Sequence, residues 1–186
     1  MLEELKVHYA NRLHIFVYDT KTLNIAEGAL AYEAKVLIEQ GESFENVAKK
    51  LDDLRRRSEF LFTLSDLDYI IRNKKLSAPA AFVANLFDIK PIMQINQIGE
   101  IIAVEKVRKL EKTLTTMGKT VEKFAANQPA FIYLTDTGHH ESTEFFKKIL
   151  ATHFGWDDLL VIRVSTISLA NHGLMGKGIG GFYGEL

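Results

Sequence analysis

Residues 88–114, "DIKPIMQINQIGEIIAVEKVRKLEKTL", determine how the second half of the chain is organised. Two apolar runs, around Ile92 and Ile101, flank a turn that contains Gly99, and this pattern predicts a β-hairpin. Apolar side chains recur at helical spacing from about residue 106 to residue 125, so the hairpin is expected to lead into a long helix. The periodicity does not explain the proline that follows a lysine, or the "VEKVR" where strand becomes helix.

The first 72 residues have the pattern of a parallel α/β layer. Residues 13–18 ("LHIFVY") and 60–64 ("FLFTL") are short runs rich in β-forming residues, and each is expected to be a buried strand. Between these two runs, residues 24–41 and 43–58 each have apolar residues at helical spacing. Gly41 is placed to end the first helix and Ser43 to cap the second. A strand, two helices and a strand predict parallel pairing through a right-handed crossover.

The second half continues the α/β alternation. Pro79 suits the first turn of a helix over residues 80–87. After the hairpin and its helix, the pattern predicts a strand at 130–135, a helix at 142–153, a strand at 159–164 and a glycine-rich end. We therefore expect an α/β protein with a two-lobe arrangement. Residues 1–72 would be a partial first lobe with a parallel sheet, and residues 73–186 a second lobe with a mixed or antiparallel sheet and helices.

Composition excludes several classes of function. With 186 residues, of which 47% are apolar, the chain can bury a core without disulfides. A net charge of −1 offers no basic surface for nucleic acid or an anionic membrane. The absence of cysteine excludes thiolate metal sites and a cysteine nucleophile. The sequence shows neither a signal peptide nor an apolar run long enough to cross a bilayer, so a cytoplasmic protein without membrane insertion is expected.

Three stretches contain residues that can do chemistry. In "TDTGHHESTE" (135–144), His139, His140, Glu141 and Glu144 could bind a metal, but a capped helix start explains them more simply. The glycine-rich end (173–181) could turn backbone N–H groups toward an anion, or simply form turns. The run "RNKK" (72–75) is either an anion-binding loop or a solvated one. Spacing assigns no Ser–His–Asp constellation, so the residues alone indicate only a soluble α/β protein.

The residues that periodicity does not explain resemble the motifs of a known protein family. Residues 68–108, "DYIIRNKKLSAPAAFVANLFDIKPIMQINQIGEIIAVEKVR", resemble the second-lobe signature of the DegV family of bacterial fatty-acid-binding proteins, with its "NIKPIL", "GEI" and "VEKVR". Residues 17–41 resemble the family's "VIDSKSASMG" stretch, and "ISLANHG" (167–173) resembles its closing "GTHTGPGALG". The matches follow the family's order and extend over essentially the whole sequence.

The sequence also departs from this family. Family members normally carry a longer N-terminal portion whose hydroxyl groups help to hold a fatty-acid carboxylate, so the resemblance implies a short form, half of a split protein or a fragment. Lys75 stands at the position of the family's loop arginine, and Asn171 stands where a threonine precedes the closing histidine. Lysine keeps the positive charge but lacks the planar fork that matches a carboxylate, so weaker anion binding is expected.

The resemblance implies that the chain binds a long-chain fatty acid and needs no other cofactor. It also implies that the chain is not an enzyme and holds no metal, and that a separate fatty acid kinase is its partner, to which the acyl carboxylate would be presented. The head-group residues implied by the match are His172, Lys75, Asn171 and Ser77. The candidate walls of an acyl tunnel, for which core packing is the alternative, are Phe82, Leu86, Ile89, Ile92 and Ile101.

Two other functions remain open from the sequence. One is an interaction or scaffold half that binds no lipid and either forms a homo-oligomer or pairs with a complementing N-terminal chain. This alternative arises because a partial lobe would expose apolar surface and a strand edge. The other is a metal-dependent enzyme that uses the histidines and glutamates of residues 139–144.

Overall fold

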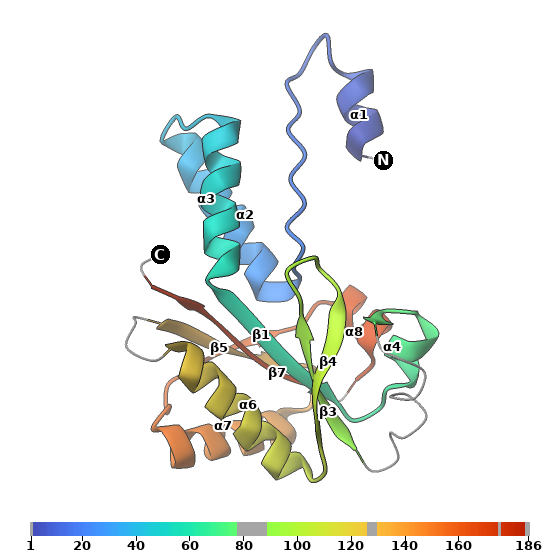
Figure 1. Ribbon diagram of the computed structural model, residues 1–186, viewed down its shortest axis with the longest axis vertical. Helices are drawn as coiled ribbons and strands as arrows, with labels where there is room; N and C mark the ends of the chain where they lie inside the picture. Colours follow the sequence, from blue (N-terminus) through green and yellow to red (C-terminus); the bar gives the residue numbers. More distant parts are fainter. Residues whose placement is uncertain (1, 78–88, 126–129, 175, 185–186) are drawn as a thin grey trace.

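The computed structural model describes residues 2–77, 89–125, 130–174 and 176–184. At its centre is one sheet of seven strands in the order β2-β4-β3-β1-β7-β5-β6 (Figure 1). The strands are β1 (Ser58–Leu64), β2 (Leu76–Ser77), β3 (Lys90–Ile95), β4 (Ile101–Val107), β5 (Ala130–Asp136), β6 (Leu160–Arg163) and β7 (Gly176–Tyr183). The helices are α1 (Leu2–His8), α2 (Asn24–Glu39), α3 (Phe44–Arg56), α4 (Asp68–Arg72), α6 (Leu110–Ala125), α7 (His140–Phe154) and α8 (Thr166–His172).

The sheet is mixed. β4 pairs with β2, and β5 with β6, in parallel, whereas the other neighbouring strands run antiparallel. The α/β class and the mixed sheet predicted for the second half are therefore confirmed. β1, which precedes residue 73, is a central strand between β3 and β7, so one sheet contains strands from both sides of the expected lobe boundary.

Side chains alternate between two cores along the central strand. Phe60 and Phe62 of β1 belong to a buried cluster with residues of α2 and α3, whereas Leu61 belongs to the cluster beneath α6 and α7. This alternation is the period of two expected of a strand that is buried on both faces. Figure 1 shows α6 and α7 together against one face of the sheet, and α2 and α3 extending away from it as a helical pair.

The predicted hairpin is confirmed as β3 and β4. Asn96 closes its turn, because its Oδ1 accepts from the backbone N–H groups of Ile98 and Glu100 at 3.1 and 2.9 Å. Gly99 adopts a positive φ of 87°, which glycine reaches without steric strain. The helix begins later than expected, since the strand continues to Val107, which pairs with Lys90.

The two helices predicted between residues 24 and 58 are confirmed as α2 and α3. The Oγ of Ser43 accepts from the backbone N–H of Asn46 at 3.2 Å, so Ser43 caps α3 as predicted. Gly41 follows the end of α2 with a positive φ of 84°. The helix predicted at 80–87 lies outside the described residues.

The strand predicted at residues 13–18 is wrong, and so is the parallel sheet that depended on it. Residues 13–23 form no strand or helix, and β1 pairs antiparallel with both of its neighbours. Instead the segment runs beside α3, where Phe16 stacks on Phe44 at 5.6 Å between ring centroids and the Tyr18 hydroxyl donates to Asp52 at 2.8 Å. Its β-forming residues lack a neighbouring strand to pair with. In the described parts of the chain, no helix is both long and apolar enough to span a membrane.

Candidate functional site

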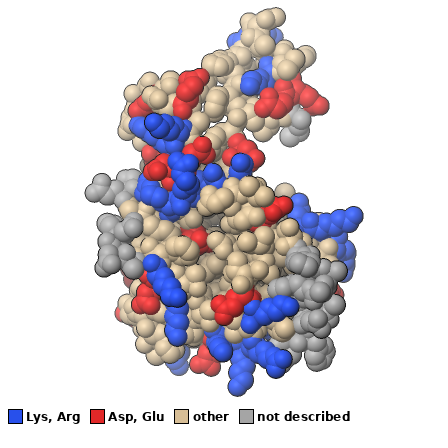
Figure 2. Space-filling model, viewed as in Figure 1, with Lys and Arg blue, Asp and Glu red and all other residues tan. Residues whose placement is uncertain are grey.

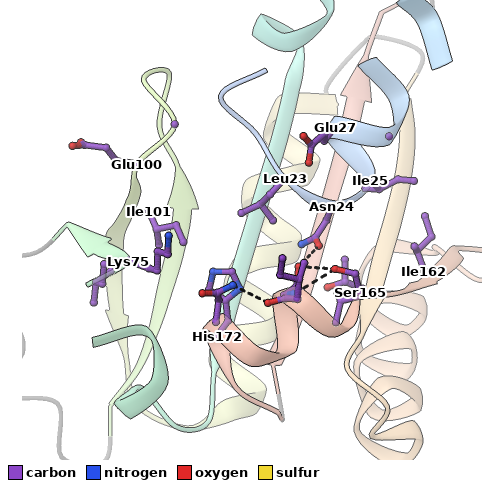
Figure 3. Close-up of a pocket in the computed structure, with 18 of the residues that line it drawn as sticks. Leu23, Asn24, Ile25, Glu27, Lys75, Glu100, Ile101, Ile162, Ser165 and His172 are labelled. Atoms are coloured by element: carbon purple, nitrogen blue, oxygen red, sulfur yellow. Dashed lines mark hydrogen bonds between the residues drawn. The ribbon is translucent and has the colours of Figure 1, made fainter. Parts of the chain in front are cut away.

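A cleft of about 960 Å³ lies between α8, the start of α2, the end of β6 and the segment that carries β2. Figure 3 shows Lys75 and Ile101 on one side of it, Ile162 and Ser165 on the other, and His172 between them in this view. The walls thus come from segments that are far apart in the sequence and meet only through the fold. Figure 2 shows acidic and basic side chains interspersed over the visible face of the molecule.

His172 lies at the last position of α8, with its ring half-buried. The imidazole is hydrogen-bonded to the backbone of Ser168, one helical turn earlier, and meets the Phe62 ring edge-on at 6.2 Å between centroids. Burial lowers the pKa of His172 below the usual 6.5, and the positive charge of Lys75 lowers this pKa further. The ring is therefore neutral at pH 7, and an anion placed beside it would favour its protonation.

Lys75 and Ser77 line the cleft from the opposite side. The backbone N–H of Lys75 donates to the carbonyl of Ile70 at 2.9 Å, which ends the short helix α4, and the chain then enters β2. Lys75 and Ser77 are both exposed, so a ligand can reach them. Asn171 lines the same cleft from α8. The structure thus brings all four of the predicted head-group residues to one cleft.

The remaining walls are partly apolar. Leu23 and Ile25 contribute from the start of α2, and Ile162 and Ile167 from the end of β6 and the start of α8. Apolar side chains therefore lie next to cationic and amide groups in a single cavity. Such a cavity suits a ligand that combines an apolar body with one anionic group.

The five proposed tunnel residues do not lie together. Ile101 lines the cleft. Ile92 is buried, with 2% of its surface exposed, in the core cluster beneath α6 and α7 on the other face of the sheet. Ile89 is half-buried just before β3 and does not line the cleft. Phe82 and Leu86 lie outside the described residues.

The glycine-rich end is not an anion-binding loop. Residues 176–183 form β7, which is buried between β1 and β5. A Cβ atom on Gly178 would lie 2.4 Å from the Thr135 Oγ1 and 2.8 Å from the Phe60 ring, closer than any side chain can approach. Glycine is needed here because neighbouring side chains pack directly on the strand backbone.

The histidines and glutamates of residues 139–144 form the exposed start of α7, as the simpler interpretation predicts. Thr143 donates its hydroxyl proton to Asp136 at 2.8 Å, so the end of β5 is tied to this first turn. Within the ranges that the structure describes, no three or more histidine, aspartate or glutamate side chains gather in a metal-binding arrangement.

Sequence reasoning missed Asn24, Ser165 and Ser168, which also line the cleft. Ser165 is the N-cap of α8 and accepts from the backbone N–H of Ser168 at 3.4 Å, and the "STIS" pattern was a usable signal for it. Ser168 donates its hydroxyl proton to the Oδ1 of Asn24 at 2.9 Å, although 144 positions separate the two residues. No local pattern could have predicted that pair.

Comparison with known proteins identifies relatives over most of the chain. The model of the DegV family, described as an uncharacterised protein family, matches residues 4–182. A DegV domain-containing protein of Clostridium acetobutylicum is 28% identical over 140 residues, which cover 75% of this chain and 50% of that protein. A Thermotoga maritima protein named "Fatty acid-binding protein" is 31% identical over 140 residues, covering 73% of this chain and 47% of that protein. The chain thus spans about half the length of these curated relatives.

Solved structures share the fold. A fatty acid binding DegV family protein from Streptococcus agalactiae superposes with a TM-score of 0.86 at 24% identity, over 99% of this chain and 64% of that one. A DegV family protein from Eubacterium eligens, loaded with heptadecanoic acid, superposes with a TM-score of 0.75 at 16% identity, over 98% of this chain and 66% of that one. At these identities the similarity shows a common fold.

Proposed function

The chain belongs to the DegV family, and from this premise we propose that it binds a long-chain fatty acid in the cleft beside α8. The carboxylate would lie beside His172 and Lys75, and the acyl chain against the apolar walls. One observation carries the proposal: Lys75, Ser77, Asn171 and His172, from two separate segments, line the same cleft.

The size and lining of the cleft support this ligand. Its volume of about 960 Å³ is at the upper end of the usual range for small-molecule sites, roughly 300–1,000 Å³. Each methylene group that the walls remove from water would contribute about 0.8 kcal/mol, so a long acyl chain supplies most of the affinity. The ammonium of Lys75 and the imidazole of His172 would then orient the carboxylate.

The proposed role is binding, without catalysis by this chain. Lys75 and Ser77 are exposed at the cleft, so a carboxylate beside them would remain within reach of a second protein. This arrangement would allow presentation to the fatty acid kinase that the family resemblance implies.

Delipidation followed by native mass spectrometry with added oleate tests the proposal. We expect one oleate to bind per chain, and binding measured by isothermal titration calorimetry to be saturable. Lys75→Ala should weaken binding, whereas Lys119→Ala should not, because Lys119 is an exposed lysine on α6, which covers the opposite face of the sheet. Absence of saturable binding of both oleate and palmitate would overturn the proposal.

A second candidate function is self-association or pairing with another chain without lipid. The observation in its favour is the segment formed by α1 and residues 10–22, which extends away from the sheet (Figure 1) and carries exposed apolar side chains such as Val7 (78%) and Leu13 (58%). Sedimentation velocity distinguishes the two: a concentration-dependent dimer that binds no oleate favours this candidate, and a monomer that binds oleate favours the first.

A further inference from the structure

Helix α8, which carries His172, is held in place differently from the large helices of the fold. None of its seven residues is fully buried, whereas α6 and α7 each bury several apolar side chains against the sheet. Apolar packing therefore does little to fix its position. What remains is the edge-on contact of the His172 ring with Phe62, the contact at Gly173, where Tyr69 packs closely, and hydrogen bonds with side chains outside the helix.

The first of these hydrogen bonds is accepted by Asn24, at the beginning of α2. Its Oδ1 accepts from the Ser168 hydroxyl at 2.9 Å, and the Ser165 hydroxyl donates to the Ser168 Oγ at 3.3 Å. Asn24 has a positive φ of 58°, which asparagine tolerates better than most residues. The backbone at the start of α2 thus directs this amide at α8.

The second comes from Asn73, two residues before Lys75. Its Nδ2 donates to the carbonyl oxygens of Asn171 at 3.2 Å and Ala170 at 3.4 Å. These carbonyls belong to the last turn of α8, where the helix itself offers them no N–H partner. Asn73 therefore links the segment that carries Lys75 to the turn that carries His172.

We propose that Asn24 and Asn73 are positioning residues, whose side-chain amides hold α8 from both sides of the cleft and so fix His172 relative to Lys75. Because α8 has no fully buried side chain, losing either amide would let the helix shift, and a shift changes where the imidazole meets an anionic group. The consequence for ligand binding rests on the proposed function, but the consequence for His172 in the free protein does not.

The test uses the full chain and two variants that break the same hydrogen bond from opposite ends. Asn24→Gly removes the Oδ1 and keeps a residue suited to positive φ. Ser168→Ala removes the hydroxyl and leaves the backbone of residue 168 available to His172. Asn73→Ala removes the second amide. Asn46→Ala is the control, since Asn46 is an exposed asparagine of α3 whose Nδ2 donates to Glu42 at 3.0 Å.

Titration of the His172 ring by NMR, without ligand, is the first measurement. The signal is assigned by its loss in His172→Ala. Because burial is the main cause of the lowered pKa, a loosened α8 should expose the ring and raise the pKa of His172 toward 6.5 in Asn24→Gly, Ser168→Ala and Asn73→Ala. The Asn46→Ala titration should match the wild type.

Oleate affinity is the second measurement. Each of the three variants should bind about fivefold more weakly, the effect of one ordinary hydrogen bond, and the Asn24→Gly/Ser168→Ala double variant should bind no more weakly than either single variant. Unchanged His172 titration in these variants would overturn the positioning role, even if affinity fell, because Asn24 or Asn73 would then act on the ligand directly. If wild-type protein bound no oleate, the proposed function would fail, and the ligand-free titration would still decide the positioning role.

Discussion

Replacing Glu59 of β1 should make the protein more stable above neutral pH. Its carboxylate accepts from the Nε2 of Gln94 and from the backbone N–H of Phe60, both at 3.2 Å. Burial nevertheless raises the pKa of Glu59 from 4.5 to about 7, more than these two hydrogen bonds lower it. A pKa raised by folding means that the group's stabilising contribution is complete below pH 4.5 and is lost as the pH rises through 7.

The size of the effect follows from that difference. A pKa gap of about 2.5 corresponds to about 3 kcal/mol between the fully protonated and fully ionised limits. Glu59→Gln removes the ionisation, but its amide nitrogen cannot accept one of the two hydrogen bonds, which costs about 1 kcal/mol. The variant should therefore be about 2 kcal/mol more stable than the wild type at pH 8, and less stable by up to about 1 kcal/mol at pH 4.5.

Urea unfolding of both proteins from pH 4.5 to pH 8.5 measures this difference. Glu105→Gln is the control, because Glu105 is an exposed glutamate on β4. The diagnostic result is a change of sign across the titration. A stability difference between Glu59→Gln and wild type that stays constant over this range would refute the account of Glu59 as a buried, ionised carboxylate.

Three further predictions concern the cleft and the core. Lys75→Arg should tighten oleate binding several-fold, because guanidinium matches a carboxylate better than ammonium does; unchanged calorimetric affinity would mean that Lys75 does not contact the ligand. In wild-type protein, affinity for ionised oleate should fall as the pH rises, because a bound carboxylate raises the lowered pKa of His172; His172→Ala should lose that dependence and about 1–3 kcal/mol of binding energy. Gly118→Ala should destabilise the protein by about 1–3 kcal/mol, since its Cβ would lie 2.5 Å from the Phe154 ring. Gly28→Ala, whose Cβ would meet nothing within 4 Å, should stabilise the protein by up to about 1 kcal/mol. Melting temperatures that shift in the same direction in the two variants would contradict this packing argument.

Features of the fold that depend on neighbouring residues were predictable from the sequence. The β3–β4 hairpin, the α2 and α3 helices and the Ser43 cap each depend on contacts within a few positions along the chain. The predicted strand at residues 13–18 failed because β-forming residues make a strand only where another strand is available. The converse holds for β7. Its glycines have low strand propensity, yet it is an interior strand of the sheet because β1 and β5 pair with it on either side.

The same division applies to the cleft. The four head-group residues were predicted from the resemblance to family motifs: Lys75, Ser77, Asn171 and His172. Their spacing alone left solvated loops and simple turns as alternatives. The sequence could not show on which face of the sheet Ile92 lies. A strand that is buried on both faces contributes apolar residues to both cores, and its sequence does not indicate which face borders the cleft. It could not pair Asn24 with Ser168 either.

Local chemistry in the sequence was thus sufficient for the α/β class, most helices and the hairpin, since backbone propensity, capping and turn geometry act over a few residues. Strand order, the two faces of the sheet and the cleft were decided only by the tertiary structure. These features depend on which distant segments pack together, as when Asn24 meets Ser168 across 144 positions and sets one wall of the cleft against another. Such contacts form because apolar faces must be buried and polar groups paired over the whole chain at once, a condition that no short stretch of sequence contains.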